Sequence, residues 1–354
     1  MASTLFRIGS RFLWKTETGS NSSDSTIRRG ALGFAVPVGY AVDGITAREI
    51  IGIQKLAGKY GVATFVHARF SSQADPLSGA LATSEFISNL GIYGGGLLFH
   101  HIHQQALGTT DMVLNRIDDA RANGLNVLGE IYPYNFGATI VAADYLVPSN
   151  YGPAMGRTYS DITESATGKP LTKERYEELM QAAPTTAVTF LGSTDEVMLS
   201  ALARPGTTVV GSDAFPLTIL ATGENAFDWD TPYEGLGGHP RGAGSYALVL
   251  RLVREDDLMS LMTALGKMSY DVARFLEDSG VSLMAYKGRI QVGADADITI
   301  FDPETVTENS TMDEPGLPST GIPYVLVNGT IVVKDSEVLE GVYPGQAVRM
   351  PVRN

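Results

Sequence analysis

Histidine is scarce in this sequence, yet four of its five copies stand at the ends of two neighbouring apolar runs. His67 ends one run, and His100, His101 and His103 follow the other. The 34-residue interval from His67 to His101 fits one strand–helix unit, which would bring both side chains to adjacent strand ends. A lone histidine is usually a packed or surface residue. This constellation, joined by a carboxylate, instead predicts a site for Zn²⁺ or another divalent metal.

Asp213 follows the β-branched run 207–210 and is the carboxylate best placed to join the histidines. It could also be only a helix N-cap or turn residue. Beside a metal, which lowers the pKa of bound water from about 15.7 to about 7, such a carboxylate can take the water's proton and later give it to a leaving nitrogen. The pattern therefore predicts hydrolysis, with Asp213 as the residue that carries the proton. The same carboxylate cannot easily also be a metal ligand.

Short apolar runs alternate with helical patterns from Gly30 onward, which is typical of repeated strand–helix units around a parallel sheet. Strands are predicted at 31–38, 62–66, 96–99, 125–131 and 207–212, and helices at 46–60, 84–90 and 111–123. Polar residues end several of these strands. In a (β/α)8 barrel that is the face where active sites are built.

The pattern changes after Gly238. Helices are predicted at 243–252, 256–265 and 268–276, followed by a β-rich stretch in which Asn328-Gly329 predicts a hairpin. We expect three parts: a leading segment at 1–29, a partial metal-dependent hydrolase (β/α) barrel at 30–285, and a small β-rich subdomain at 286–354. The basic, serine-rich opening is interpreted either as an irregular lead into the fold or as a transit peptide.

Composition excludes several classes of protein. Asp and Glu number 39 against 26 Lys and Arg, giving a net charge of −13, which argues against nucleic-acid binding and against an anionic membrane surface. Without cysteine there can be no disulfide or thiolate metal site. No apolar run is long enough to span a membrane. We expect a cytoplasmic, globular protein.

Seven short motifs occur in an order that resembles the amidohydrolase superfamily, specifically its N-acyl-D-amino-acid deacylase branch of D-aminoacylases and D-glutamate deacylases. The resemblance covers roughly residues 30 to 350. The motifs are Gly30-Ala31-Leu32-Gly33-Phe34, Val66-His67-Ala68-Arg69, the histidines 100–103, Glu130-Ile131-Tyr132-Pro133-Tyr134, Gly211-Ser212-Asp213, His239-Pro240-Arg241-Gly242, and Gly293-Ala294-Asp295-Ala296-Asp297-Ile298 with Phe301-Asp302-Pro303.

This resemblance implies an α/β fold, a metal-dependent TIM barrel that hydrolyses the amide bond of N-acyl-D-amino acids. By position, His67 resembles the metal ligand of barrel strand five and His101 that of strand six. Asp213 resembles the general base and acid of strand eight. The implied cofactor is Zn²⁺ or another divalent metal, and the implied partner is a small N-acyl amino acid.

Three further residues are candidates for substrate binding. Tyr134 falls where family members use a tyrosine near the substrate carboxylate, and His103 falls where some D-aminoacylases carry a lysine. Arg69 is added for its position two residues from a ligand, with a salt bridge under the loops as the alternative. His100 is expected to pack behind the site, and His239 is expected to fix the loop after strand eight.

The chain departs from the family at its beginning, because no histidine precedes His67 to supply the ligands of strand one. We therefore expect an incomplete TIM-type barrel of about strands four to eight that lacks the family's N-terminal part. Fragment, shortened variant and inactive remnant all stay open. Alternative functions are a dihydroorotase-like or hydantoinase-like amide hydrolase, or a non-catalytic assembly subunit. An incomplete sheet also predicts a homo-oligomer or a partner that completes the barrel.

Overall fold

Five parallel strands form the central sheet of the computed structural model, which describes residues 18–42 and 44–353. Along the sheet they are β1 (Gly33–Pro37), β2 (Ala63–His67), β3 (Gly96–Phe99), β4 (Asn126–Ile131) and β9 (Thr208–Val210). Each predicted strand corresponds to one of these five. The prediction of an α/β fold with a partial barrel of five strands is confirmed.

The strands are aligned so that their carboxyl ends meet at one edge. Pro37 at the end of β1 lies opposite His67 at the end of β2, and Val66 lies opposite Phe99 at the end of β3. Ile131 at the end of β4 lies opposite Val210 at the end of β9. Side chains that follow different strands therefore reach the same region of the molecule.

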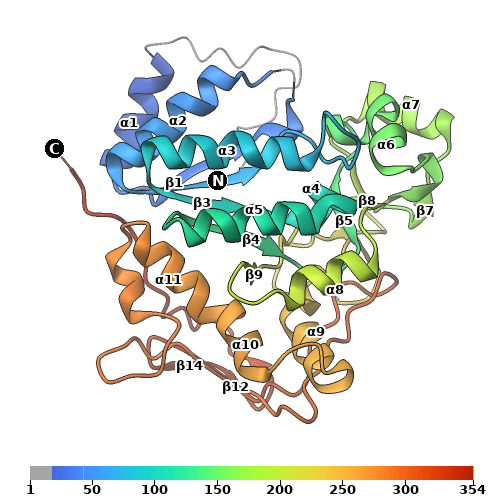
Figure 1. The fold of residues 1–354 in the computed structure, drawn as a ribbon. Helices are drawn as coiled ribbons and strands as arrows, with labels where there is room; N and C mark the ends of the chain where they lie inside the picture. The colour runs from blue at the N-terminus through green and yellow to red at the C-terminus, as the bar shows by residue number, and fades with distance from the viewer. Residues whose placement is uncertain (1–17, 43, 354) are drawn as a thin grey trace.

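Four helices cover the outer face of this sheet (Figure 1): α2 (Ala47–Tyr60), α3 (Gly79–Tyr93), α5 (Thr110–Ala122) and α8 (Asp195–Ala203). Helix α2 shows why the sequence folds this way. Thr46 and Glu49 form a capping box at its start, and Gly61, in the left-handed region at φ 66°, ends it.

The inner face of the sheet carries the side chains that alternate with those on the helical side. Ala63 of β2 and Leu128 of β4 lie here and pack with Phe275 of α11 (Asp271–Asp278). Because side chains alternate along a strand, His67 and Glu130 share this inner face, nearer the carboxyl edge. The topology thus aims both side chains into the barrel interior.

A long insertion between β4 and α8 builds a second, antiparallel sheet beside the carboxyl edge (Figure 1). Its strand order is β5 (Phe136–Ile140), β8 (Ala187–Leu191), β6 (Ile162–Glu164) and β7 (Lys169–Pro170). Helices α6 (Pro148–Met155) and α7 (Lys173–Ala182) belong to the insertion, which has its own apolar core around Tyr145, Tyr151 and Phe190. Sequence analysis gave no structure for this segment.

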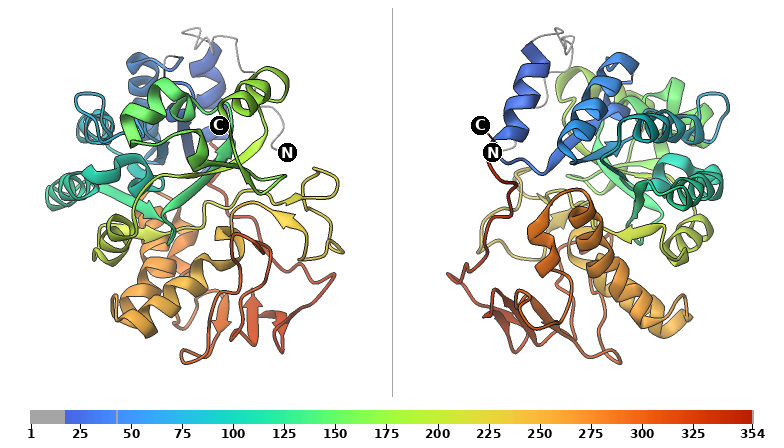
Figure 2. Two further views of the ribbon diagram at one scale, coloured as in Figure 1. Left: turned by 90° about the vertical axis from the view of Figure 1, so that its right-hand side faces the viewer. Right: turned by 60° about the vertical axis from the view of Figure 1, so that its left-hand side comes forward.

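The C-terminal part lies beneath the sheet and forms the β-rich subdomain, after which the chain returns to the start of the fold, where the N–H of Met350 donates to the carbonyl of Gly30 (Figure 2). Helix α9 (Arg241–Asp256) is longer than predicted, while the helix predicted at 256–265 is wrong in its first half, because α10 spans only Leu261–Leu265. Asp257 ends α9 in the left-handed region. A π-helical turn at Gly266–Tyr270 then joins α10 to α11.

The subdomain sheet contains β12 (Ile298–Ile300), β13 (Tyr324–Val327), β14 (Thr330–Lys334) and β15 (Glu337–Val338). Asn328 and Gly329 join β13 to β14 with φ of 49° and 75°, as a hairpin turn of this sequence requires. The predicted hairpin is confirmed.

The leading segment differs from the irregular lead that was expected, because Thr18–Arg28 form helix α1, which contacts α2. Residues 1–17, with most of the suspected transit peptide, lie outside the described residues. No helix in the described part of the chain is long and apolar enough to cross a membrane. The remaining elements are α4 (Ile102–Ala106), β10 (Thr218–Ile219) and β11 (Leu236–Gly237).

Candidate active site

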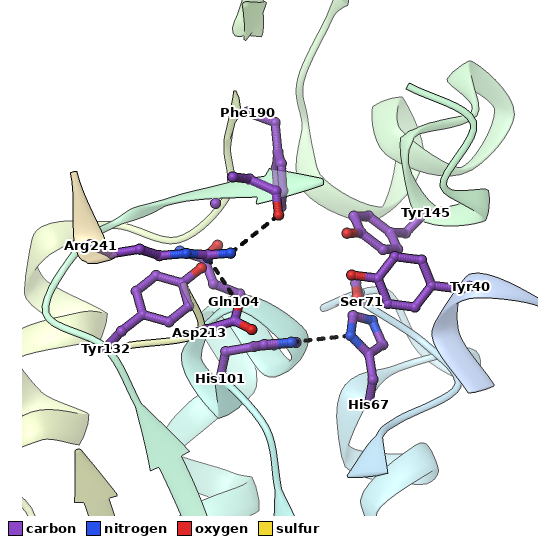
Figure 3. Close-up of a pocket in the computed structure, with 12 residues that line it drawn as sticks. Tyr40, His67, Ser71, His101, Gln104, Tyr132, Tyr145, Phe190, Asp213 and Arg241 are labelled. Atoms are coloured by element: carbon purple, nitrogen blue, oxygen red, sulfur yellow. Dashed lines mark hydrogen bonds and ion pairs between the residues drawn. The ribbon is translucent and has the colours of Figure 1, made fainter. Parts of the chain in front are cut away.

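A cavity opens at the carboxyl edge of the parallel sheet, between that sheet and the inserted one (Figure 3). His67 and His101 line it from the barrel strands, while Asp213 and Arg241 line it from the chain after β9. Its other lining residues are Tyr40, Ser71, Gln104, Tyr132, Gly137, Ala138, Tyr145 and Phe190. Sequence analysis named three of these twelve as site residues.

The two candidate ligands face each other directly. Nδ1 of His67 lies 3.1 Å from Nε2 of His101, and both side chains are buried. Burial lowers the pKa of His67 well below its ordinary value and that of His101 to about 3, so both rings are held neutral. Nε2 of His67 and Nδ1 of His101 have no hydrogen-bond partner.

These two imidazoles fit two positions of a metal site. Nitrogens bound to one tetrahedral Zn²⁺ at about 2.1 Å lie about 3.4 Å apart, close to the separation of the facing nitrogens. Neutral imidazole is the form that binds a metal, and a cation would replace the single proton these nitrogens share. Within the described ranges, however, no group of three or more His, Asp or Glu side chains is arranged around one point. His67 and His101 are therefore two candidate ligands without a third beside them in the described part of the chain.

Asp213 forms an ion pair with Arg241 across the cavity, with 2.9 Å between Oδ2 and Nη1. Arg241 is 2% exposed, lies over the Tyr132 ring at 4.7 Å, and donates to the carbonyl of Ala138. Desolvation raises the pKa of the Asp213 carboxyl, and the Arg241 charge opposes that rise. Asp213 is thus an aspartate with strengthened basicity beside a fixed cation.

Two predicted substrate-binding residues lie outside the cavity lining. His103 is fully buried, and its Nε2 donates to the carbonyl of Tyr134 at 3.0 Å. Burial lowers the pKa of His103 to about 4, so it carries no charge that could replace a lysine. The phenol of Tyr134 lies against Gly244 of α9, whereas Tyr132, two residues earlier, lines the cavity. The tyrosine in contact with the site is therefore Tyr132.

Arg69 also lies away from the lining. Its guanidinium pairs with Glu85 at 3.3 Å and donates to the carbonyls of Val42 and Ile45. This geometry agrees with the alternative interpretation, a salt bridge under the loops, and leaves no contact with the cavity.

His239 holds the loop that presents Arg241. Its Nδ1 accepts from the backbone N–H of Arg241 at 3.1 Å, and its Nε2 donates to the carbonyl of Phe136 at 2.9 Å. This is the loop-fixing role expected for His239. Arg241 was named from the sequence only as part of a motif, and its guanidinium enters the cavity.

Several lining residues were missed from the sequence, and among Tyr40, Tyr145 and Phe190 only Tyr40 had a signal that could have identified it. Phe190 comes from β8 of the inserted sheet and Tyr145 from a 3₁₀ turn of the same insertion (Asp144–Leu146), whose position over the barrel edge is a tertiary property. Tyr40 follows the end of β1, and the strand-end rule that found His67 could have found it. Its ring lies 4.6 Å from the His67 ring.

Comparison with known proteins agrees with this architecture. Residues 198–333 match the family model described as amidohydrolase family. The N-acyl-D-glutamate deacylase of Alcaligenes xylosoxydans xylosoxydans is 29% identical over 321 residues, which are 86% of this chain and 59% of that protein. The crystal structure of N-acyl-D-glutamate deacylase from Bordetella bronchiseptica, complexed with zinc and a phosphonate inhibitor, matches with a TM-score of 0.73 at 27% identity. This structural match covers 93% of this chain and 65% of the Bordetella bronchiseptica chain.

A crystal structure of D-aminoacylase shares the fold, with a TM-score of 0.69 at 23% identity over 91% of this chain and 63% of that one. The amidohydrolase match thus lies in residues 198–333, and the likeness to the deacylases extends over most of the chain. The chain is similar to N-acyl-D-glutamate deacylases and to D-aminoacylase. It spans between 59% and 65% of the length of the two deacylases.

Proposed function

We propose that this chain is a metal-dependent hydrolase of amide bonds whose substrates are N-acyl-D-amino acids. The observation that carries the proposal is one cavity in which two facing neutral imidazoles lie beside a basic carboxylate paired with a buried guanidinium. Relatives whose names state deacylation of N-acyl-D-glutamate, and one described with zinc, support both the reaction and the metal.

In the proposed reaction His67 and His101 would hold a divalent cation, which would supply Lewis acidity for the activation of a water molecule. Asp213 takes the proton of the attacking water at Oδ1 or Oδ2 and returns it to the leaving nitrogen. Arg241 has an Nε atom without a hydrogen-bond partner and a positive charge beside Asp213, so it can bind the carboxylate of the amino-acid product. The aromatic side chains of Tyr40, Tyr145 and Phe190 limit access of other water.

The experiment is to load the chain with Zn²⁺, measure bound metal, and assay N-acetyl-D-glutamate and N-acetyl-D-methionine against their L enantiomers. We expect D-selective release of the free amino acid, and loss of at least about a hundredfold in kcat/KM for Asp213→Asn, because proton transfer is removed while the cavity is kept. Bound metal far below one equivalent, or equal rates for Asp213→Asn, would contradict the proposal.

The same measurements also test two alternative functions. Hydrolysis of hydantoin or dihydrouracil in preference to N-acyl amino acids would assign the chain to the cyclic amide hydrolases. An undiminished biological role for Asp213→Asn would identify a non-catalytic subunit. We also propose that the chain is cytoplasmic and forms a homo-oligomer, the latter because apolar side chains of the sheet β12–β15 are exposed.

A further inference from the structure

The backbone of His101 departs from the strand that it follows, and this departure places its imidazole in the cavity. Along β3 and beyond, Phe99 packs on the outer face and His100 on the inner face, where its ring lies near Phe65. Continued alternation would turn His101 outward. Instead His101 adopts φ 30° and ψ 55°, in the left-handed region, and its ring meets His67 inside the barrel.

A left-handed backbone is unusual for a residue other than glycine and needs support from its surroundings. Here the support is Glu130 on the inner face of β4. Its Oε2 accepts the backbone N–H of His101 at 2.9 Å, and the same atom lies 3.5 Å from Nδ1 of His100. The carboxylate is buried, so the bond is formed away from competing water.

The chain makes room for this carboxylate at the end of the neighbouring strand. A Cβ added to Gly211 would lie 2.2 Å from Oε1 of Glu130, so only glycine leaves the carboxylate where it is. The backbone N–H of Gly211 donates to the carbonyl of Ile131, which fixes the strand end beside Glu130. Glu130 therefore lies between the strand ends that carry His101 and Asp213.

We propose that Glu130 is a positioning residue, which turns the His101 imidazole toward His67 by holding the left-handed backbone of His101 through its N–H. The proposal rests on the proposed function only for its consequence on metal binding. The hydrogen bond itself belongs to the metal-free chain. Its accepting oxygen, rather than the charge, is the feature required, so glutamine should replace glutamate at this position.

The test compares Glu130→Gln with Glu130→Leu, which removes the acceptor and keeps the bulk. Zn²⁺ affinity is measured by competition with a chromophoric chelator, and exchange of the His101 backbone amide is measured by NMR on the metal-free chain. We expect Glu130→Leu to weaken Zn²⁺ binding about 10- to 100-fold, as loss of groups supporting a metal ligand does, and to speed amide exchange at least about tenfold. Glu130→Gln should stay within about threefold of wild type in both.

Two further variants separate positioning from general damage to the fold. Gly211→Ala alters neither histidine and should reproduce both effects of Glu130→Leu by displacing the carboxylate. Glu164→Leu removes another buried carboxylate, one paired with Arg175 in the inserted sheet, and should leave Zn²⁺ affinity and His101 exchange unchanged.

The proposal is overturned if Glu130→Leu binds Zn²⁺ and exchanges its His101 amide as wild type does. It is equally overturned if Glu130→Gln is as impaired as Glu130→Leu, because charge would then be the requirement. If wild type itself binds no Zn²⁺, the proposed function fails, and amide exchange alone decides the role of Glu130.

Discussion

The guanidinium of Arg241 sets the conditions under which Asp213 can act as a base. Burial raises the pKa of Asp213, and the ion pair with Arg241 limits that rise. Arg241 is itself held by the N–H bond to His239 and by the Tyr132 ring, so its charge stays in place as substrate enters. The basicity of Asp213 is thus governed by two opposing effects, both visible in the cavity.

This balance predicts the pH dependence of an Arg241→Met variant. Arg241 lowers the pKa of Asp213, so removing the guanidinium raises that pKa and delays formation of the carboxylate as pH increases. The acidic limb of kcat/KM against pH should move to higher pH by about one unit. Arg241→Lys keeps a cation and should keep the limb near its original position. A limb that stays put in Arg241→Met would remove Arg241 from the control of Asp213.

Among the structural elements, the short 3₁₀ turn η1 (Val38–Tyr40) after β1 places two residues directly at the site. Tyr40 contributes an aromatic wall, and Gly39 lies directly against His67. A Cβ on Gly39 would come 2.2 Å from Cδ2 and 2.4 Å from Nε2 of the His67 ring. The turn therefore fixes the side of the ring opposite His101.

We predict that Gly39→Ala forces the His67 ring to move and weakens Zn²⁺ binding at least about tenfold, as loss of ligand orientation does. The matched control is Gly52→Ala within α2, where a Cβ meets no atom within 4 Å. That control should keep wild-type metal affinity and gain about 0.5–1 kcal/mol in free energy of unfolding, because alanine favours a helix. Calorimetric Zn²⁺ titration and urea unfolding measure the two effects. Unchanged metal binding in Gly39→Ala would show that the ring position is not set by this turn.

Local patterns predicted the five strands of the parallel sheet and the helices α2, α3 and α5, and they failed where tertiary contacts decide. The capping residues Thr46 and Gly61 marked α2, and Asn328-Gly329 marked a hairpin, because each signal acts within a few residues. The strand-end rule found His67, since parallel strands bring their carboxyl ends together. It could not show that the Tyr134 phenol turns away while Tyr132 enters the cavity.

The inserted sheet was missed for the same physical reason. Its strands pair across long stretches of chain, as Phe136 does with Leu191, and no periodic signal records such a partner. Glu130 shows the limit at the site itself. Its side chain acts on the backbone of His101, 29 residues away, and that contact depends on the left-handed conformation of His101.

At the scale of the whole molecule, the sheet of β12 to β15 leaves apolar side chains exposed to solvent. None of the residues in β12, β13, β14 and β15 is buried, and the apolar side chains of Ile300 and Val338 are about half exposed, at 48% and 58%. In the hydrogen-bonded order of the described strands, β1 and β9 also stand at the two ends of the parallel sheet. Open strand edges and exposed apolar sheets favour association.

We therefore predict that the chain associates with a second copy through the sheet of β12 to β15. Light scattering after size exclusion should give a multiple of the 37.7 kDa chain mass. Val338→Lys should shift the particle toward one chain, because it places a charge on the sheet face that carries Val325, Val333 and Val338. Glu337→Lys, whose side chain points to the opposite face of β15, is the matched control and should leave the mass unchanged. A stable particle of one chain mass for wild type would contradict the association, and equal effects of both lysines would move the interface away from this face.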